Sequence, residues 1–358
     1  MSSPHILIIP SWYPTIDNPT AGAFIKQQVD ALEMAGCSVD VLYLDKKYSR
    51  LQLITSLAGN YSDAFDGVHK AGFTPDIIHV HALWPAGLGA VAISKKYDIP
   101  FVVTEHSEEY SRGTERKLIR TPGMLPFVLR PLAQKAAAYI APSTCAAKRL
   151  EELGLYSPVQ VISNVVPVRQ PAPLSTKEPK RIVHVSQLGP AKNLSLLLRA
   201  IARLRDRRND FVLDIVGDGQ CRDKYAKLAS ELHLDGAVGF HGRASTDEVN
   251  AHLDRAAFGV LASDHETFSV FAAECLMAGR PVVSTRCGGP EGFIGSEQGM
   301  LVDTGNLDSL VAALDHMLDH YTDYDPIALN AYAAERFSPS VVSQQLLELY
   351  ADVLGGSR

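Results

Sequence analysis

The chain has 358 residues, of which 46% are hydrophobic and 21% are charged, and its formal net charge is −6. The length favours two domains, and the composition is that of a globular protein with enough apolar residues for a sizeable core. The acidic balance argues against a general nucleic-acid-binding protein, so no nucleic-acid partner is expected.

The five cysteines are odd in number and scattered, without a C-x-x-C pair. We interpret them as small buried hydrophobic residues rather than disulfide partners or zinc ligands. The chain begins without a signal peptide, and no apolar run reaches the length of a membrane span, which together predict a cytoplasmic protein. Residues 1–168 carry 15 basic and 15 acidic residues, whereas residues 169–358 carry 19 and 25, so any membrane-facing role is expected in the first half.

Strand and helix patterns alternate along the first part of the chain, which predicts a parallel sheet covered by helices on both faces. Apolar runs predict strands at 5–10, 39–44, 76–80, 100–104, 139–142 and 159–162. Helices are expected at 21–35, 88–96 and 143–153. A proline-rich polar segment, 169–180, then predicts a linker.

After the linker the same alternation restarts, which predicts a second domain of the same class. Strands are expected at 181–185, 211–216, 238–241, 258–262 and 281–284. Helices are expected at 194–204 and 221–232, with a short helix from about Ser269 to 278. A strongly amphipathic helix closes the chain from Ser338.

The short helix is the most informative stretch, because nearly all of its residues are apolar or small, as in a buried helix. It nevertheless contains Glu274, and Glu266 lies in the loop before it. A buried carboxylate needs hydrogen-bonding partners or a ligand. The predicted helix N-terminus at Ser269 is suited to bind anions. Carboxylates for sugar hydroxyls beside N–H groups for phosphates would suit a nucleotide-sugar.

Other candidates lie where predicted strands end, which is where doubly wound folds bind ligands. Gly22 lies between the first strand and first helix, where it is either a ligand-approaching residue or a plain turn glycine. His106 follows the strand at 100–104, and His79 and His81 end the strand before it. Histidine can donate to a sugar hydroxyl or move a proton, although a single histidine is more often structural.

Two further loops offer groups for phosphate. Gly189 and Lys192 lie between a strand and a helix that Asn193 is expected to cap, so the lysine and the helix dipole can converge on an anion. The alternative is a solvated surface lysine. Gly288 and Gly289, after the strand at 281–284, are either exposed backbone donors or an irregular connection.

With these residues the chain resembles the retaining glycosyltransferases of family four, which have the GT-B fold. The resemblance spans nearly the whole chain: P-S-W-Y-P at 10–14 followed by Gly22, D-I-I-H-x-H at 76–81, T-E-H at 104–106, E-x7-E from Glu266 to Glu274, and A-G-R-P-V-V at 278–283. It implies an α/β protein with two Rossmann-like domains whose parallel sheets face each other across a cleft. The domains would be an acceptor domain, 1–168, joined by the C-terminal helix 338–356, and a donor domain, 181–337.

The resemblance also implies roles for the matching positions. Glu274 would hold the ribose hydroxyls, Glu266 and His106 would contact the donor sugar, and Lys192 would neutralise the diphosphate. Backbone contacts would come from Gly22, Gly189, Thr267, Phe268 and Ser269. Such enzymes need no metal or other cofactor, because a lysine and helix N-termini neutralise the charge. They retain anomeric configuration through front-face attack, and the leaving diphosphate helps to deprotonate the acceptor.

The chain departs from the family at Gln187, where an arginine is usual five residues before the lysine. Arg243 or Arg286 are the candidates to supply the missing cation. Asp323-Tyr324-Asp325 matches the D-x-D that binds metal in some sugar transferases, but it lies in a predicted loop near the tail, so we interpret it as chance.

The expected partners are a UDP- or GDP-linked sugar donor and a glycan or lipid-linked acceptor, as in bacterial surface polysaccharide or glycolipid synthesis. Residues 112–130 mix cations with apolar residues, which is typical either of peripheral contact with the inner face of a membrane or of a basic loop followed by a core helix. The alternatives are a sugar-nucleotide epimerase or hydrolase on the same fold, and a non-catalytic nucleotide- or protein-binding partner.

Overall fold

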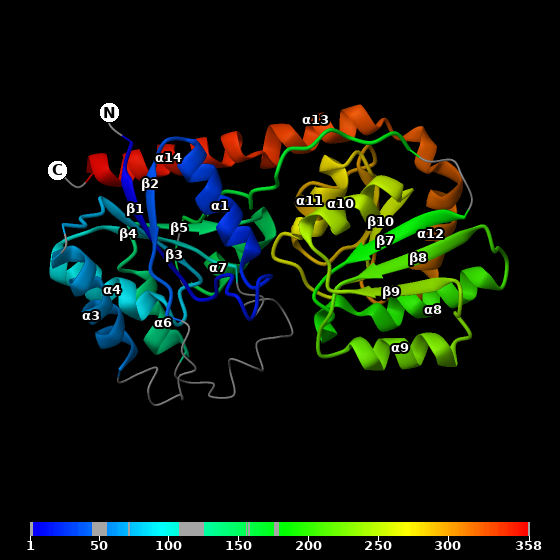
Figure 1. The fold of residues 1–358 in the computed structure, drawn as a ribbon, viewed down its shortest axis with the longest axis horizontal. Coiled ribbons are helices and arrows are strands. Elements are labelled where there is room, and N and C mark those ends of the chain that lie inside the picture. Colours follow the sequence, from blue (N-terminus) through cyan, green and yellow to red (C-terminus); the bar gives the residue numbers. More distant parts are fainter. Residues whose placement is uncertain are drawn as a thin grey trace. The chain divides into compact units, whose positions relative to one another are not determined.

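The computed structural model describes residues 3–44, 56–70, 72–106, 125–154, 156, 158–174 and 179–356. It divides into two compact units (Figure 1). Unit 1 consists of Met1–Val165 together with Phe337–Arg358, and unit 2 is Val166–Arg336.

Unit 1 is built on a six-stranded parallel sheet in the order β2-β1-β3-β4-β5-β6. Its strands are β1 (His5–Pro10), β2 (Ser38–Val41), β3 (Ile77–His81), β4 (Phe101–Thr104), β5 (Ala138–Ala141) and β6 (Gln160–Val161). Its helices are α1 (Ala23–Met34), α3 (Leu57–Lys70), α4 (Gly87–Tyr97), α6 (Leu125–Ala133), α7 (Thr144–Glu152) and α14 (Pro339–Gly356).

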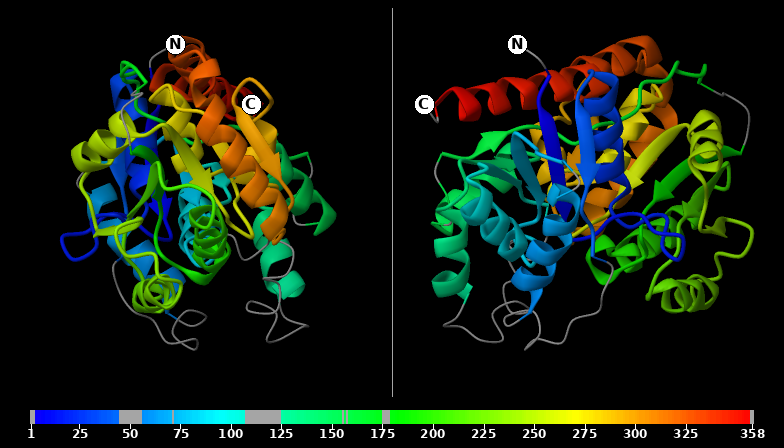
Figure 2. Two further views of the ribbon diagram at one scale, coloured as in Figure 1. Left: turned by 90° about the vertical axis from the view of Figure 1, so that its right-hand side faces the viewer. Right: turned by 60° about the vertical axis from the view of Figure 1, so that its left-hand side comes forward.

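Helices cover both faces of this sheet, which explains why its strands are apolar without alternation. In β1, Leu7 and Ile9 belong to the core under α3, α4, α6 and α7, whereas Ile6 and Ile8 face the core under α1 and α14. The C-terminal helix α14 is thus part of unit 1 and packs beside α1 (Figure 2).

Unit 2 repeats the plan with the strand order β12-β11-β10-β7-β8-β9. Its strands are β7 (Lys180–Val185), β8 (Phe211–Val216), β9 (Val238–Gly242), β10 (Phe258–Leu261), β11 (Val282–Thr285) and β12 (Gly299–Val302). Its helices are α8 (Leu194–Arg205), α9 (Arg222–Glu231), α10 (Thr246–Arg255), α11 (Val270–Met277), α12 (Leu307–His320) and α13 (Pro326–Phe337).

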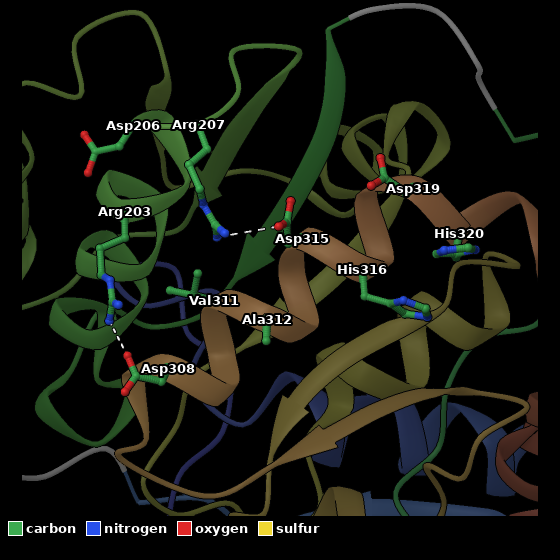
Figure 3. Close-up of a pocket in the computed structure, with 10 residues that line it drawn as sticks. All are labelled: Arg203, Asp206, Arg207, Asp308, Val311, Ala312, Asp315, His316, Asp319 and His320. Carbon is green, nitrogen blue, oxygen red and sulfur yellow. Dashed lines mark hydrogen bonds and ion pairs between the residues drawn. The ribbon is translucent and has the colours of Figure 1, made fainter.

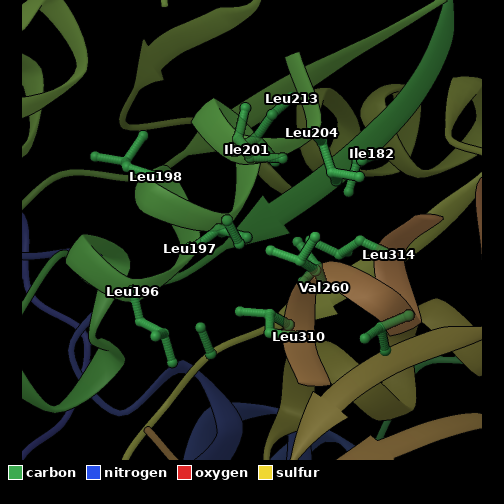
Figure 4. Close-up of a cluster of buried hydrophobic side chains, with 14 of the residues drawn as sticks. Ile182, Leu196, Leu197, Leu198, Ile201, Leu204, Leu213, Val260, Leu310 and Leu314 are labelled. Atoms are coloured by element: carbon green, nitrogen blue, oxygen red, sulfur yellow. The ribbon is translucent and has the colours of Figure 1, made fainter. Parts of the chain in front are cut away.

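The larger core of unit 2 lies between its sheet and the layer of α8, α9 and α12 (Figure 4). Leu197, Ile201 and Leu204 of α8 pack there against Leu213 of β8 and Leu314 of α12. Helices α10 and α11 cover the opposite face (Figure 1).

The two parallel sheets confirm the predicted fold class, and most predicted elements are present within a few residues of their expected bounds. The predicted strand at 39–44 is shorter, because β2 ends at Val41. Of the α-helices and strands in the described residues, five were not predicted: α3, α10, α12, α13 and β12. Helix α6 was expected only as one alternative for 112–130. Among the described residues, no helix combines the length and apolar character needed to span a bilayer.

Candidate functional site

Each sheet has one point at which the strand order reverses, and ligands bind in open α/β sheets outside the carboxyl ends of the strands at such a point. In unit 2 the chain runs outward from β7 through β8 to β9, then returns to place β10 on the other side of β7. The loops after β7 and β10 therefore define the candidate site of unit 2. Lys192 lies in the first loop and Glu266 in the second.

The two loops are joined by side chains. Lys192 donates from Nζ to Glu266 Oε1 at 3.0 Å, and Ser263 donates from Oγ to the same oxygen at 2.7 Å. The side chains of Lys192 and Glu266 are 17% and 10% exposed. Asn193 donates to Asp264 at 2.8 Å and also caps α8, as expected, by accepting from the Leu196 N–H. The sequence-predicted cation and carboxylate are thus brought into direct contact.

A third loop, after β11, supports Glu266 from the other side. The Glu266 N–H donates to the Cys287 carbonyl at 2.8 Å, and its own carbonyl accepts from the Gly289 N–H at 2.8 Å. A Cβ at position 289 would lie 2.4 Å from the Phe268 Cα, so only glycine permits this approach. These bonds fix the backbone of the Glu266 loop.

Helix α11 begins where the Glu266 loop ends. Ser269 has φ of 77°, an uncommon conformation for a residue other than glycine, and its Oγ accepts from the Ala272 N–H as the predicted N-cap. The first N–H groups of a helix have no partner inside it, so this terminus offers donors to an anion. Thr267 and Phe268 lie immediately before it, and Phe268 is buried.

Glu274 is the partly exposed carboxylate of an otherwise buried helix. It lies one turn after Val270, and these are the two residues of α11 that are not fully buried. Burial nevertheless removes enough water to raise the pKa of Glu274 to about 7, against a smaller opposing effect of Arg169. The sequence predicted a helix buried on all sides, whereas Val270 and Glu274 form one partly accessible stripe of it.

The candidates to replace the arginine absent at Gln187 lie on either side of the Lys192 loop. Arg243 is exposed after β9, the edge strand, and β8 separates β9 from β7. Arg286 follows β11, and its Nε lies 3.8 Å from Asp303 Oδ1. Gly189 adopts an extended conformation, and its carbonyl accepts from the Tyr225 hydroxyl at 3.0 Å.

In unit 1 the strand order reverses between β1 and β3, so the loops after these strands define its candidate site. Gly22 ends the loop after β1 with φ of 64° and directly precedes α1. A Cβ there would lie 2.6 Å from the Trp12 carbonyl oxygen. The glycine is therefore required by the turn itself, whatever its role toward a ligand.

Three buried histidines form a stack beside this loop. His79 and His81 of β3 stack at 4.4 Å between ring centroids, and His81 stacks on His106 at 5.3 Å. Burial lowers the pKa of His79 and His106 to about 3, and that of His81 well below its usual value. All three imidazoles are neutral at pH 7.

The amide nitrogen of Gln28, which can only donate, fixes the proton positions of His81 and His106. Gln28 donates from its amide to His81 Nε2 at 3.4 Å, so neutral His81 carries its proton on Nδ1 and donates to His106 Nε2 at 3.0 Å. The proton of neutral His106 is then on Nδ1. His79 contacts the hydroxyls of Tyr350 and Thr104 at 2.6 and 2.7 Å. His106 can therefore donate a hydrogen bond from Nδ1 and is not available as a base there. Both ring nitrogens of His79 contact side chains of the protein, so we interpret His79 as structural.

Sequence reasoning missed four residues of these sites: Ser263, Asp264, Gln28 and His184. Ser263 and Asp264 lie in the loop after β10, two and three residues past its last residue, a position that itself signals a site in a parallel sheet. His184 of β7 accepts from Ser186 at 2.7 Å and donates to the Val260 carbonyl at 2.9 Å. Gln28 is 53 residues from His81, and no local pattern indicates their contact.

A separate pocket of about 850 Å³ lies between α8 and α12 (Figure 3). Its wall is charged, with Arg203 paired to Asp308 and Arg207 to Asp315. It contains none of the predicted site residues. Of segment 112–130, residues 112–124 lie outside the described ones, and Leu129 of α6 is buried in the core of unit 1.

Two family models match the chain over adjoining segments. The model described as "Glycosyltransferase Family 4" matches residues 21–170, and "Glycosyl transferases group 1" matches residues 169–334. The chain belongs to glycosyltransferase family 4. The first model spans the histidine stack of unit 1, and the second spans Lys192, Glu266 and Glu274 of this family 4 chain.

Curated relatives share about a quarter of the sequence. Glycogen synthase from Mycobacterium tuberculosis is 28% identical over 255 residues, which make up 68% of this chain and 60% of that protein, so the chain spans about 60% of this relative's length. The lipopolysaccharide core biosynthesis glycosyltransferase LpsE from Rhizobium meliloti is 27% identical over 290 residues, or 78% of this chain and 74% of LpsE.

Solved structures share the fold over nearly the whole chain. Sucrose-phosphate synthase from Thermosynechococcus elongatus has a TM-score of 0.81 at 18% identity and covers 98% of this chain and 100% of its own. HepE from Anabaena, in complex with UDP and glucose, has a TM-score of 0.75 at 18% identity, with 97% and 99% covered. At this identity the likeness shows the two-domain, Rossmann-like GT-B fold.

Proposed function

We propose that this chain is a retaining glycosyltransferase that moves a sugar from a nucleoside-diphosphate sugar to a glycan or lipid-linked acceptor without a metal ion. One observation carries the proposal: Lys192 and Glu266 meet at the strand-order reversal of unit 2, 3.0 Å apart and mostly shielded from water. A cation and a carboxylate so placed can bind different parts of one nucleotide-sugar. The lysine would bind the phosphate, and the carboxylate would accept hydrogen bonds from the sugar hydroxyls.

The chemistry follows from charge. As the glycosidic bond to the diphosphate breaks, negative charge develops on the leaving oxygen, and groups already fixed around it lower the barrier. Lys192 and the N–H groups at the start of α11 supply that stabilisation, with Gly189 and Arg243 as further contacts. In this role Lys192 shifts from Glu266 to the phosphate, and the freed carboxylate accepts from sugar hydroxyls. The diphosphate then takes the acceptor proton as the acceptor attacks from the same face.

The remaining assignments complete the donor contacts. Glu274, on the accessible stripe of α11, accepts from the two ribose hydroxyls, and backbone groups of Thr267, Phe268 and Ser269 contact sugar or diphosphate. His106 donates from Nδ1 to a hydroxyl of the transferred sugar, and Gly22 offers backbone to a phosphate. The tautomer derived for His106 supports a donor and disfavours a catalytic base.

For the donor base, the transferred sugar and the acceptor, we propose chemical classes and not single compounds. UDP and GDP are the donor bases that we propose, and the UDP and glucose named for HepE favour testing UDP first. The name of LpsE supports an acceptor from surface polysaccharide synthesis. Such an acceptor would place the protein at the inner face of a membrane, with contact through 112–130.

A thermal-shift screen tests the proposal, with UDP, GDP, ADP and their common sugars, each with and without EDTA. A ligand at about 100 times its dissociation constant adds about 2.7 kcal/mol of stability, which moves the melting temperature measurably. We expect one nucleotide to raise the melting temperature by the same amount with and without EDTA. The increase should be smaller for the Glu274→Ala variant. No shift with any nucleotide would contradict the donor assignment and favour a protein-binding partner.

The nucleotide identified in this way then permits a transfer assay, with the anomeric configuration of the product read by NMR. Retention with EDTA present is the expected result. Release of free sugar or an epimerised nucleotide-sugar without transfer, even with lipopolysaccharide-type acceptors, would instead identify a hydrolase or an epimerase.

A further inference from the structure

A second cluster of ionisable side chains lies in unit 2, on strands and a helix that carry neither Lys192 nor Glu266. It consists of Asp214 on β8, His241 on β9 and His252 on α10. Along β8, Phe211, Leu213 and Ile215 point into the main core, so Asp214 points to the opposite face, which α10 covers. Asp214 pairs with Gly239 of β9, and His241 lies two residues farther along that strand, from where its Nε2 reaches Asp214 Oδ1.

From this geometry we infer that Asp214, His241 and His252 form a binding site for one divalent transition-metal ion of the zinc type, held by two imidazoles and one carboxylate. The three ligand atoms all lie within 4.8 Å of one another. Two ligand atoms of a tetrahedral Zn²⁺, each about 2.0–2.2 Å from it, are about 3.3–3.6 Å apart. The 2.8 Å between His241 Nε2 and Asp214 Oδ1 and the 3.7 Å between His252 Nδ1 and Asp214 Oδ2 lie on either side of that separation. The His241 side chain is 37% exposed, so its ring has room to rotate toward that geometry.

The partly buried histidine of the cluster, His252, has an unsatisfied nitrogen that a metal would satisfy. His252 is 11% exposed, and its Nδ1 has no hydrogen-bond partner among the residues that the structure describes. The Asp214 Oδ2 atom is 3.7 Å from it, beyond hydrogen-bond distance. A buried polar atom without a partner costs free energy, and coordination by Nδ1 removes that cost.

The surroundings of Asp214 are those of a metal-binding carboxylate. Arg181 donates to Asp214 Oδ2 at 2.8 Å, which orients the carboxylate and leaves Oδ1 for the metal. In the structure His241 Nε2 lies 2.8 Å from Oδ1, a hydrogen bond that the metal would replace with two coordinate bonds. Gly239 makes room for this ring, since a Cβ there would lie 3.0 Å from His241 Nε2.

The chemistry of the donors selects the metal class. Imidazole favours Zn²⁺, Ni²⁺ and Cu²⁺, and three protein ligands leave at least one position for water. Because β9 is the edge strand of the sheet, a metal here would fasten that edge to β8 and α10. The site is separate from the proposed transfer chemistry, and the metal independence of that reaction does not bear on it.

Zinc binding to the untagged, full-length protein tests the inference, after dialysis against EDTA and by competition with a chromophoric chelator. We expect one Zn²⁺ per chain and at least about 10-fold weaker binding in His241→Ala and in His252→Ala. His241 is the more exposed of the two, so its variant still tests the site if His252→Ala folds poorly. Thermal unfolding with and without zinc gives the second measurement, with a shift in wild type that both variants lose.

The matched control is the double variant His316→Ala/His320→Ala. These exposed histidines lie one turn apart on α12, with ring centroids 4.2 Å apart, and could bind zinc by themselves. The inference requires that this variant bind zinc as wild type does. Loss of binding in the control, or a Co²⁺ complex with the strong near-ultraviolet band of thiolate ligands, would overturn the assignment, as would absence of stoichiometric binding.

Discussion

Glu274 in α11 lowers the stability of the ligand-free protein at neutral and higher pH, where its carboxylate is ionised. Its pKa of about 7, against 4.5 for an ordinary glutamate, means that the fold favours the protonated form. The stabilising contribution of the protonated group is complete below about pH 4.5 and is lost as the pH rises through 7. A ligand that donates two hydroxyls to the carboxylate would reverse this preference, so the same residue would lower stability and raise affinity.

The first prediction concerns Glu274→Gln, which removes the ionisable group but keeps its shape. The free variant is expected to be about 1–3 kcal/mol more stable than wild type at pH 8, with the difference vanishing toward pH 4.5. Urea denaturation across this pH range measures it. The variant should also lose most of the nucleotide-induced thermal shift. Equal stability at pH 8 would show that the carboxylate is better solvated than we infer.

Lys192 gives a second prediction at the same scale. Replacing a group that stabilises developing negative charge typically lowers kcat by about 10²–10³-fold. We expect that loss in Lys192→Met, and partial recovery in Lys192→Arg, which restores the charge with a different shape. Steady-state kinetics with the nucleotide-sugar provide the measurement. Lys227→Met, at an exposed lysine of α9, is the control and should keep full activity. A change in KM alone would show that Lys192 binds donor and transition state equally.

At the scale of elements, the loop before α11 depends on a close approach between two backbones. Gly289→Ala would put a methyl group 2.4 Å from the Phe268 Cα and displace the Glu266 loop. We expect transferase activity to fall by more than about 10-fold, because displacing substrate-binding groups by about 1 Å typically lowers the rate by that much or more. The control is Gly67→Ala in α3, where an added Cβ meets no atom within 4 Å and should stabilise the helix slightly. Equal activity of the two variants would contradict the proposed role of this loop.

Periodicity made some helices predictable from the sequence but not all of them, since α12, which buries six of its 14 residues, was also missed. Helix α8 was expected from its spaced leucines, whereas α10 buries only Leu253 and was missed. The available signal for α10 was the capping box of Ser245 and Glu248, which the structure contains. Local rules also did not predict the positive φ of Ser269, because serine seldom adopts it.

The candidate site was predictable where it depends on strand ends and not where it depends on contacts between distant segments. Lys192 and Glu266 each follow a strand, so the sequence indicated both, but their 3.0 Å contact required the strand order of the sheet. The proton arrangement of His106 depends on Gln28, which reaches the stack from α1. Such long-range contacts have no trace in residue spacing.

At the scale of the whole molecule, the two units differ in how the chain builds them. Unit 2 is continuous from Val166 to Arg336, whereas unit 1 needs the C-terminal helix α14 to cover one face of its sheet. Val342, Leu346, Leu349 and Tyr350 of α14 are buried in that core. The Tyr350 hydroxyl also contacts Nδ1 of His79, so removing α14 would expose apolar surface and take away the partner of that buried nitrogen.

The last prediction follows from this difference in connectivity. A fragment of residues 166–336 should fold cooperatively and still bind the nucleotide that stabilises the full chain, because it contains the whole core of unit 2 together with Lys192, Glu266 and Glu274. Residues 1–165 alone should show weak, non-cooperative unfolding and bind a dye for exposed apolar surface, since a face of several large residues is uncovered. A rearranged unit 1, in which residues 337–356 are joined through a flexible linker to the start of residues 3–165, should again unfold cooperatively. Leu346→Ala in that rearranged protein should lower its free energy of unfolding by about 2–5 kcal/mol. Cooperative unfolding of residues 1–165 by themselves would show that α14 covers the sheet without being required for its stability.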